Sequence, residues 1–191
     1  MNRKEVKIDR RTRYTRMVIK DTFLSLLSEK DYADITVAEI CRGAEINRGT
    51  FYLHYDNIRQ VMDELFDDAL RNTHGMLTQF GCMESGDTGC SYPLCRFLRD
   101  NRKYQPLFFS DSLQSHVIEK IAASSRDTFL EEMGKATGLD EESLLAVFYF
   151  QLNGCLAVSK RNAGISDEQW EDIQCQLDRL LKAGVEELKK K

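Results

Sequence analysis

The residues of this chain best suited to chemistry share one face of a short helix that we expect between Arg48 and Tyr55. Phe51 and Tyr55 stand four residues apart, so both should be buried on the other face. The outward face then carries Arg48, Gly49, Thr50, Tyr52, Leu53 and His54. Guanidinium and hydroxyl groups on an exposed helix suit contacts with the phosphates and base edges of double-stranded DNA. A merely solvated helix face is the alternative interpretation.

The preceding residues predict how this helix is held. Thr36 can cap a first helix, and Glu39, three residues later, completes a capping box. Glu45 and the residue after it form the turn, and Asn47 is a favourable N-cap for the second helix. Two short helices joined in this way have the geometry of a helix-turn-helix, whose second helix enters the major groove of DNA.

The spacing of residues across 36–56 is also that of a long family signature. The positions in register are Thr36, Ile40, Cys41, Ala44, Ile46, Asn47, Gly49, Thr50, Phe51, Tyr52, His54 and Tyr55. This ungapped pattern resembles the TetR family of bacterial transcriptional regulators. Glu45 departs from it by replacing the usual turn glycine, which costs about 1–2 kcal/mol if that position needs a positive φ. Ile58 departs from it by standing where the family usually has a phosphate-contacting lysine, and Arg59 is the neighbouring cation.

The resemblance implies a role for each exposed residue. Thr50, Tyr52 and the N-terminus of the helix that begins at Thr36 would bind phosphates. Arg48 would bind guanine and Leu53 a thymine methyl group. His54 would add a phosphate contact, with a structural histidine as the alternative. The complete expected DNA-binding set is Thr36, Asn47, Arg48, Gly49, Thr50, Tyr52, Leu53, His54 and Arg59.

The formal charge of the chain is distributed unevenly. The net charge of −4 is the sum of +3 over residues 1–60 and −7 over residues 61–191. The basic excess is concentrated in Arg3, Lys4, Lys7, Arg10, Arg11, Arg13 and Arg16. This segment is expected to be a solvated tail, an arm that follows phosphates, or both. A basic end on an acidic remainder suits a protein that presents one end to a polyanion.

Targeting signals are not apparent. The N-terminus is too charged for a signal peptide, and no apolar run approaches the ~20 residues that span a bilayer. The six cysteines contain no C-x-x-C pair. They therefore suit a reducing compartment rather than a disulfide framework. We expect a cytoplasmic protein that does not bind membranes.

Helical periodicity continues to the end of the chain without strand alternation, so the expected fold is all-α, and the resemblance implies that it is TetR-like. We expect a three-helix DNA-binding head at 1–60 and an effector-binding and dimerisation domain at 61–191. Asp56 should cap a fourth helix that runs to about His74. Further helices are expected from Pro93 to about Asp100, from about Ser112 to Gly138, from Asp140 to Ala163 with Gly164 as its terminating glycine, and from a capping box of Ser166 and Gln169 onward.

The last two helices are expected to form a dimer interface, and the aromatic residues of the second domain are expected to line an effector pocket. The resemblance implies that the last two helices pair across a two-fold axis as a homodimer that binds a palindromic operator. The expected interface residues are Phe150, Val158, Trp170, Ile173, Leu177 and Leu180. A pocket for a small apolar effector would be lined by Phe66, Phe97, Phe108, Phe109, Val117, Phe129, Phe148 and Cys155. For each of these residues a filled core is the alternative.

No motif in the chain predicts catalysis, a cofactor or a metal site. The sequence has no G-x-S-x-G, no P-loop and no clustered acid–base set, and its three histidines are scattered. The expected function is a transcriptional regulator, a repressor by resemblance, that an effector releases from DNA. The alternatives are control by a partner protein or by oxidation of Cys82, Cys90 and Cys95.

Overall fold

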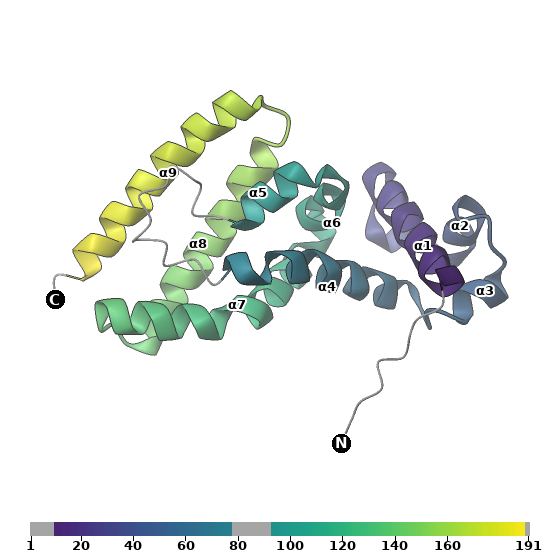
Figure 1. Ribbon diagram of the computed structural model, residues 1–191, viewed down its shortest axis with the longest axis horizontal. Coiled ribbons are helices and arrows are strands. Elements are labelled where there is room, and N and C mark those ends of the chain that lie inside the picture. The colour runs from purple at the N-terminus through teal and green to yellow at the C-terminus, as the bar shows by residue number, and fades with distance from the viewer. Residues whose placement is uncertain (1–9, 78–92, 190–191) are drawn as a thin grey trace, which may run out of the picture. The chain divides into compact units, whose positions relative to one another are not determined.

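The structure, a computed structural model of the chain, describes residues 10–77 and 93–189. Every regular element within those ranges is helical (Figure 1). The chain divides into two units whose boundary lies between Asp68 and Ala69, inside the fourth α-helix. This boundary falls later in the chain than the one expected after residue 60. None of the described helices combines the length and apolarity that a membrane span requires.

The first unit is built from α1 (Arg10–Glu29), the short 3-10 helix η1 (Tyr32–Asp34), α2 (Val37–Gly43), α3 (Arg48–Tyr52) and the first part of α4 (Ile58–Leu77). Its core joins all four α-helices. The fully buried side chains include Ile19, Phe23, Ile40, Phe51, Val61 and Phe66. Because α2 and α3 are too short to be stable alone, this shared core is what holds them in place.

The start of α4 differs from the sequence prediction. The Gln60 N–H donates to Asn57 Oδ1 at 3.0 Å, so Asn57 is the side-chain cap of this helix. Asp56, the expected cap, instead exchanges two hydrogen bonds with the Gln60 side chain, at 2.8 and 2.7 Å. Both residues are good N-caps, and the one-residue shift follows from where the chain leaves the tight turn after α3.

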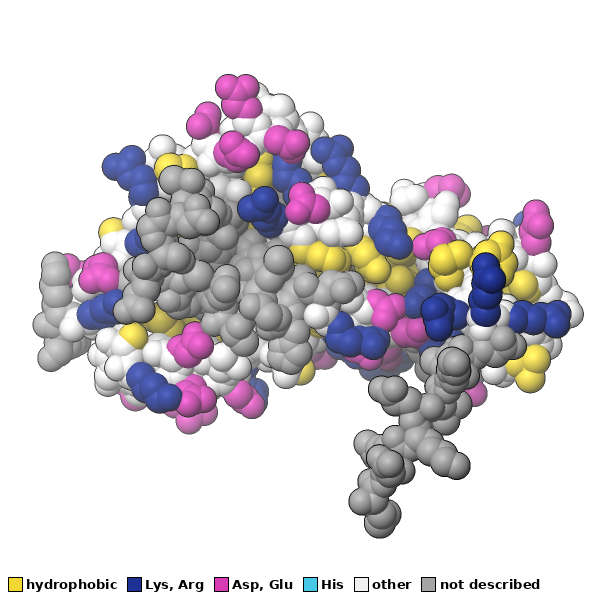
Figure 2. All heavy atoms as spheres, in the orientation of Figure 1, with side chains coloured by type: hydrophobic (Ala, Val, Ile, Leu, Met, Phe, Trp, Pro, Cys, Tyr) yellow, Lys and Arg dark blue, Asp and Glu magenta, His cyan; other side chains and the backbone are white. Residues whose placement is uncertain are grey.

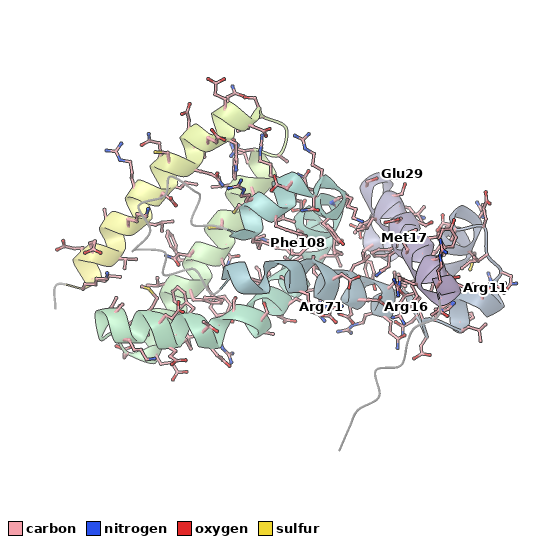
Figure 3. All side chains as sticks on the ribbon, viewed as in Figure 1. Arg11, Arg16, Met17, Glu29, Arg71 and Phe108 are labelled. Atoms are coloured by element: carbon pink, nitrogen blue, oxygen red, sulfur yellow. The ribbon has the colours of Figure 1, made fainter. Side chains whose placement is uncertain are left out.

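A group of charged side chains joins α1 to α4, and we call it the α1–α4 clasp. Arg16 and Lys20 on α1 pair with Glu64 on α4, and Lys20 also reaches Asp68 at 2.5 Å. The Arg16 guanidinium also lies 5.0 Å from the centre of the Tyr55 ring. Figure 3 shows Arg16 on the α4 side of α1, while Arg11 projects from its N-terminal end. The clasp therefore fixes α4 to α1, and Arg16 also contacts Tyr55, which follows α3.

The second unit contains, after the end of α4, α5 (Pro93–Asp100), η3 (Arg102–Tyr104), α6 (Gln105–Phe109), η4 (Asp111–Leu113), α7 (Gln114–Thr137), α8 (Glu141–Arg161) and α9 (Asp167–Leu188). The most extensive packing is between α7 and α8, where the Phe129 and Phe148 rings lie 5.2 Å apart. A short turn after α8 reverses the chain into α9 (Figure 1).

The helix ends of this unit follow local rules, with one exception. Gly138 ends α7 in the left-handed region at φ 69°, Asp140 caps α8, and Ser166 with Gln169 forms the expected capping box of α9. Gly164 does not terminate α8 as we expected. The helix ends at Arg161, and the Asn162 amide and backbone N–H both donate to the Val158 carbonyl. The asparagine side chain satisfies that carbonyl, so a left-handed glycine is not needed.

Candidate nucleic-acid interface

The turn between α2 and α3 closes through a Schellman motif. The Ile46 N–H donates to the Cys41 carbonyl at 2.9 Å, and the Glu45 N–H donates to the Arg42 carbonyl at 3.3 Å. Glu45 therefore stands at the position that requires left-handed backbone, and its φ is 53°. Among the residues that the structure describes, it is the one non-glycine with positive φ. The strain expected from the sequence is confirmed.

Asn47 starts α3 as predicted. Its Oδ1 accepts a hydrogen bond from the Thr50 N–H at 2.7 Å and another from the Thr50 hydroxyl at 3.1 Å. A Cβ at Gly49 would lie 3.2 Å from the same oxygen, so glycine at this position leaves room for the cap. The cap holds the Thr50 hydroxyl beside the first turn of α3, and the hydroxyl must turn away from Asn47 to donate to a phosphate.

The outer face of α3 is exposed, as the sequence indicated. Arg48 is exposed at the first helical position, Tyr52 is 54% exposed, and Leu53 is 82% exposed. The helix is shorter than expected, since it ends at Tyr52 rather than at Tyr55. The remaining residues turn inward to bury Tyr55, and His54 is only partly exposed. Leu53 is therefore free to contact a ligand at the end of α3.

The start of α2 is tied into a charged network. The Glu39 N–H donates to the Thr36 hydroxyl, and the Thr36 N–H donates to Glu39 at 3.0 Å. Lys30, which follows α1, pairs with Glu39 at 2.7 Å. The hydrogen bond from Lys30, followed by those from Thr36, lowers the pKa of Glu39 to about 2. Both polar groups of Thr36 are thus engaged in the capping box that starts α2.

Further cations surround this surface. Arg10, Arg11 and Arg13 are exposed on the first turns of α1, where Figure 2 shows Lys and Arg side chains gathered. The sequence suggested a mobile tail or arm for these arginines, but from residue 10 onward they are helical. Arg59 is 70% exposed and pairs with Asp63 at 3.8 Å, so its guanidinium lies at the surface. Arg3, Lys4 and Lys7 lie outside the described residues.

The residues expected to line an effector pocket are mostly core residues. Phe66 belongs to the first unit, and the other seven belong to the second. Phe66, Phe97, Phe108, Val117, Phe129 and Phe148 are buried, while Phe109 and Cys155 are partly exposed. Phe109 alone of the eight lines one of the two described cavities, a space of about 10 Å³ beside Cys95 and Trp170. That volume is about the size of one water molecule.

The residues expected at a dimer interface divide into two groups. Phe150 on α8 is 76% exposed and Leu180 on α9 is 69% exposed, while Val158, Ile173 and Leu177 are partly buried. Trp170 is only 5% exposed, because it packs against Cys95 and lies beneath the Arg99 guanidinium, 5.5 Å from its ring centre. Trp170 therefore belongs to the core of its own chain, whereas the sequence placed it at the dimer interface.

The helix-turn-helix and the helices beside it also match a known family. The model of a family described as bacterial regulatory proteins, tetR family, covers residues 21–65. Residues 21–65 therefore resemble the corresponding part of TetR-family regulators. A relative that matches part of the chain, named an uncharacterized HTH-type transcriptional regulator, YxbF, comes from Bacillus subtilis (strain 168). It is 44% identical over 63 residues, which are 32% of this chain and 17% of that protein.

A solved structure extends the likeness beyond the helix-turn-helix. The dihydroxyacetone kinase operon activator DhaS aligns with 90% of this chain and 96% of its own at a TM-score of 0.52, with 21% sequence identity. This match shows a shared fold over both units. The TetR-like all-α fold expected from the sequence is thus confirmed, and the match over residues 21–65 is to a family of regulatory proteins. Among the described residues, no three metal-ligating side chains are grouped closely enough to hold an ion.

Proposed function

We propose that this protein binds a palindromic DNA operator as a homodimer and represses transcription from it. The observation that carries this proposal is the exposed outer face of α3, where Arg48, Tyr52 and Leu53 project from a helix whose other side is fully buried. The Arg48 guanidinium can donate two hydrogen bonds to one base, Tyr52 carries a hydroxyl group, and Leu53 carries an exposed apolar side chain. These are the group types that read a major groove.

Each side chain of this face has a definite task in the proposal. Arg48, at the first position of α3, donates two hydrogen bonds to the O6 and N7 atoms of a guanine. Leu53, at the other end of the helix, packs on a thymine methyl group. Thr50 and Tyr52 donate to phosphates and set the register of the helix. Arg59 and the exposed arginines at the start of α1 add phosphate contacts, and Arg59 supplies the cation that Ile58 does not.

Dimerisation follows from the exposed apolar side chains of α8 and α9. Phe150 and Leu180 are large, and each has more than two thirds of its surface in water. An isolated chain gains nothing from this exposure, whereas a second copy would bury both. Two copies related by a two-fold axis present two α3 helices, which is the arrangement that reads a palindrome. Operator binding places the protein in the cytoplasm with the bacterial DNA.

Regulation requires that the dimer have two states. A small apolar effector that binds the second unit more tightly in one state would change operator affinity by its differential binding energy.

The sign of regulation depends on where the operator lies relative to the promoter. The structural neighbour DhaS is named an operon activator, so this fold serves activation in that protein. A reporter that places the selected operator over a promoter tests repression directly.

The experiment that tests the proposal is selection of bound duplexes from a random pool, followed by a salt titration of the best one. We expect a palindrome with two equal half-sites. If the dimer neutralises about five phosphates, log K should fall with log salt at a slope of about −4.5. Enrichment of an unpaired half-site would contradict the homodimer, and no enrichment would contradict operator binding. In the second case the partner-protein alternative gains support.

A further inference from the structure

Two cysteines that are 60 residues apart in sequence meet in the second unit. The Cys95 thiol on α5 donates to the backbone carbonyl oxygen of Cys155 on α8 at 4.0 Å, and the Cys155 side chain packs against the buried cluster that contains Cys95. Neither cysteine is in a disulfide. Cys95 is 8% exposed, and Cys155 is more accessible. Two reduced cysteines packed together, one buried and one partly exposed, form a dithiol pair.

The surroundings of this pair favour its reactivity. The hydrogen bond from Cys155 lowers the pKa of the Cys95 thiol against the opposing effect of burial, and Ser159 acts in the same direction as Cys155. Ser159 is 6% exposed, and its buried hydroxyl oxygen has no partner at hydrogen-bond distance and angle among the described residues. It lines the same small cavity as Cys95. A stabilised thiolate beside a more exposed thiol is the arrangement found in redox-responsive cysteine pairs.

We propose that Cys95 and Cys155 are a modification site, at which a hydroperoxide converts the dithiol to a disulfide that joins α5 to α8. The more accessible Cys155 thiol loses its proton, attacks one peroxide oxygen and breaks the O–O bond. This step gives a sulfenic acid, and the displaced hydroxide takes up the proton and leaves as one water. The Cys95 thiolate then attacks the Cys155 sulfur, forms the S–S bond and displaces hydroxide, which leaves as a second water. Two thiols and one hydrogen peroxide thus give one disulfide and two waters, and the two electrons pass from sulfur to peroxide.

The location of the pair connects this chemistry to the C-terminal helices. Cys95 and Trp170 form one buried cluster, against which Cys155, Val158, Ile165, Ile173 and Leu181 pack. Arg99, one turn after Cys95, holds the start of α9 by donating to Asp167 at 2.8 Å and to the Ile165 carbonyl at 2.6 Å. Since α9 is seated on the residues that the disulfide would move, oxidation changes how α8 and α9 are presented. This consequence for DNA rests on the proposed function, because α8 and α9 are the proposed dimer helices.

The experiment treats the full-length chain with hydrogen peroxide, blocks the remaining thiols and maps the peptides without reduction. We expect a peptide that links Cys95 to Cys155, with a mass loss of two hydrogens that dithiothreitol reverses. Operator affinity, measured before and after oxidation, should change by about fivefold or more. The Cys155→Ser variant should lose both responses. The Cys175→Ser variant, which changes an exposed cysteine on α9, should keep both.

The outcomes separate this inference from the proposed function. A disulfide between other cysteines, or oxidation that stops at Cys155 alone, would overturn the assignment of the pair. The expected linkage with unchanged operator affinity would confirm the modification site and remove its regulatory role. If the reduced protein binds no operator, the proposed function fails, and peptide mapping still decides whether the pair is oxidised. Equal thermal unfolding of reduced wild type and Cys155→Ser would show that a lost response is chemical rather than a folding defect.

Discussion

At the scale of single residues, Glu45 shows how a local rule can be broken without loss of the motif. Its backbone is left-handed in a Schellman turn, where glycine is the usual residue. The buried neighbours Ile40, Ala44 and Phe51 hold the turn in place, so the strain is sustained by packing. The strain at Glu45 therefore lowers the stability of the fold, while the geometry of the turn is kept.

Replacing this glutamate tests the strain. Glu45→Gly removes about 1–2 kcal/mol of left-handed strain and adds roughly 0.5–1 kcal/mol of unfolded-chain entropy, so we expect a net stabilisation of about 0.5–1 kcal/mol. Urea unfolding of the full chain measures it. Glu29→Gly, at the exposed and right-handed end of α1, is the control and should destabilise. A Glu45→Gly protein less stable than wild type would show that the glutamate side chain outweighs the strain.

The exposed residues of α3 allow a second test at this scale. Arg48→Ala should cost about 1–3 kcal/mol of operator binding and relax the preference at one base pair, because a bidentate base contact is lost. Tyr52→Phe removes a phosphate donor, so it should weaken binding equally for all sequences. Competition binding against single-base operator variants separates the two effects. If both variants bind like wild type, the docking face lies elsewhere.

At the scale of elements, charged side chains join helices that the sequence shows only as separate patterns. In the α1–α4 clasp, desolvation raises the pKa of Glu64, but the hydrogen bonds from Arg16 and Lys20 outweigh it, and the pKa lies below its ordinary value. Removing the Glu64 charge leaves two partly buried cations without a shared partner. The clasp therefore contributes to the position of α4 as well as to stability.

Glu64→Gln should destabilise the first unit by about 1–2 kcal/mol, a range typical of hydrogen bonds to charged groups that remain partly exposed. Glu29→Gln is the matched control, because its carboxylate is exposed on α1. Chemical unfolding gives the stability, and an operator titration shows whether a loosened α4 also weakens DNA binding. If Glu64→Gln lowers the free energy of unfolding no more than Glu29→Gln does, the clasp does not contribute to stability.

The capping box of α2 predicts a dependence on pH. The folded pKa of Glu39 is about 2, below its ordinary value of 4.5. A lowered pKa means that the contribution of Glu39 is fully present above about pH 4.5 and is lost as the pH falls toward about 2. Unfolding measured across this window should show stability falling with pH, and the Glu39→Gln variant should show a smaller slope. If stability falls with pH equally steeply in the wild type and the variant, Lys30 and Thr36 do not lower the pKa of Glu39.

At the scale of the whole molecule, the proposed dimer depends on apolar side chains that the folded chain leaves exposed. Phe150→Glu and Leu180→Glu together place charges in the proposed interface. We expect the dimer to dissociate at least about 100-fold more readily, since a large buried anchor contributes about 2 kcal/mol or more. Sedimentation velocity measures this change. Ala136→Glu, on the exposed face of α7, is the control, and unchanged dimerisation in the double variant would exclude this interface.

Much of the local structure could be predicted from the sequence. The capping boxes at Thr36 and Ser166, the Asn47 cap and the α7 terminus at Gly138 were all expected and are confirmed. Their interactions lie within four residues along the chain, so their geometry is set by residue type and spacing. The errors at Asp56 and Gly164 are also local, because Asn57 beside Asp56 and Asn162 before Gly164 offered alternative caps.

The sequence by itself determined the all-α class, the helix-turn-helix, the buried Phe51 and the chemistry of the outer face of α3. Periodicity and capping are short-range signals, and they suffice for these features. Only the tertiary structure decided that Arg16 pairs with Glu64, that Trp170 belongs to the core and that Cys95 meets Cys155. Those partners are separated by tens of residues, and which of them meet depends on how whole helices pack, for which periodicity in one helix carries no information.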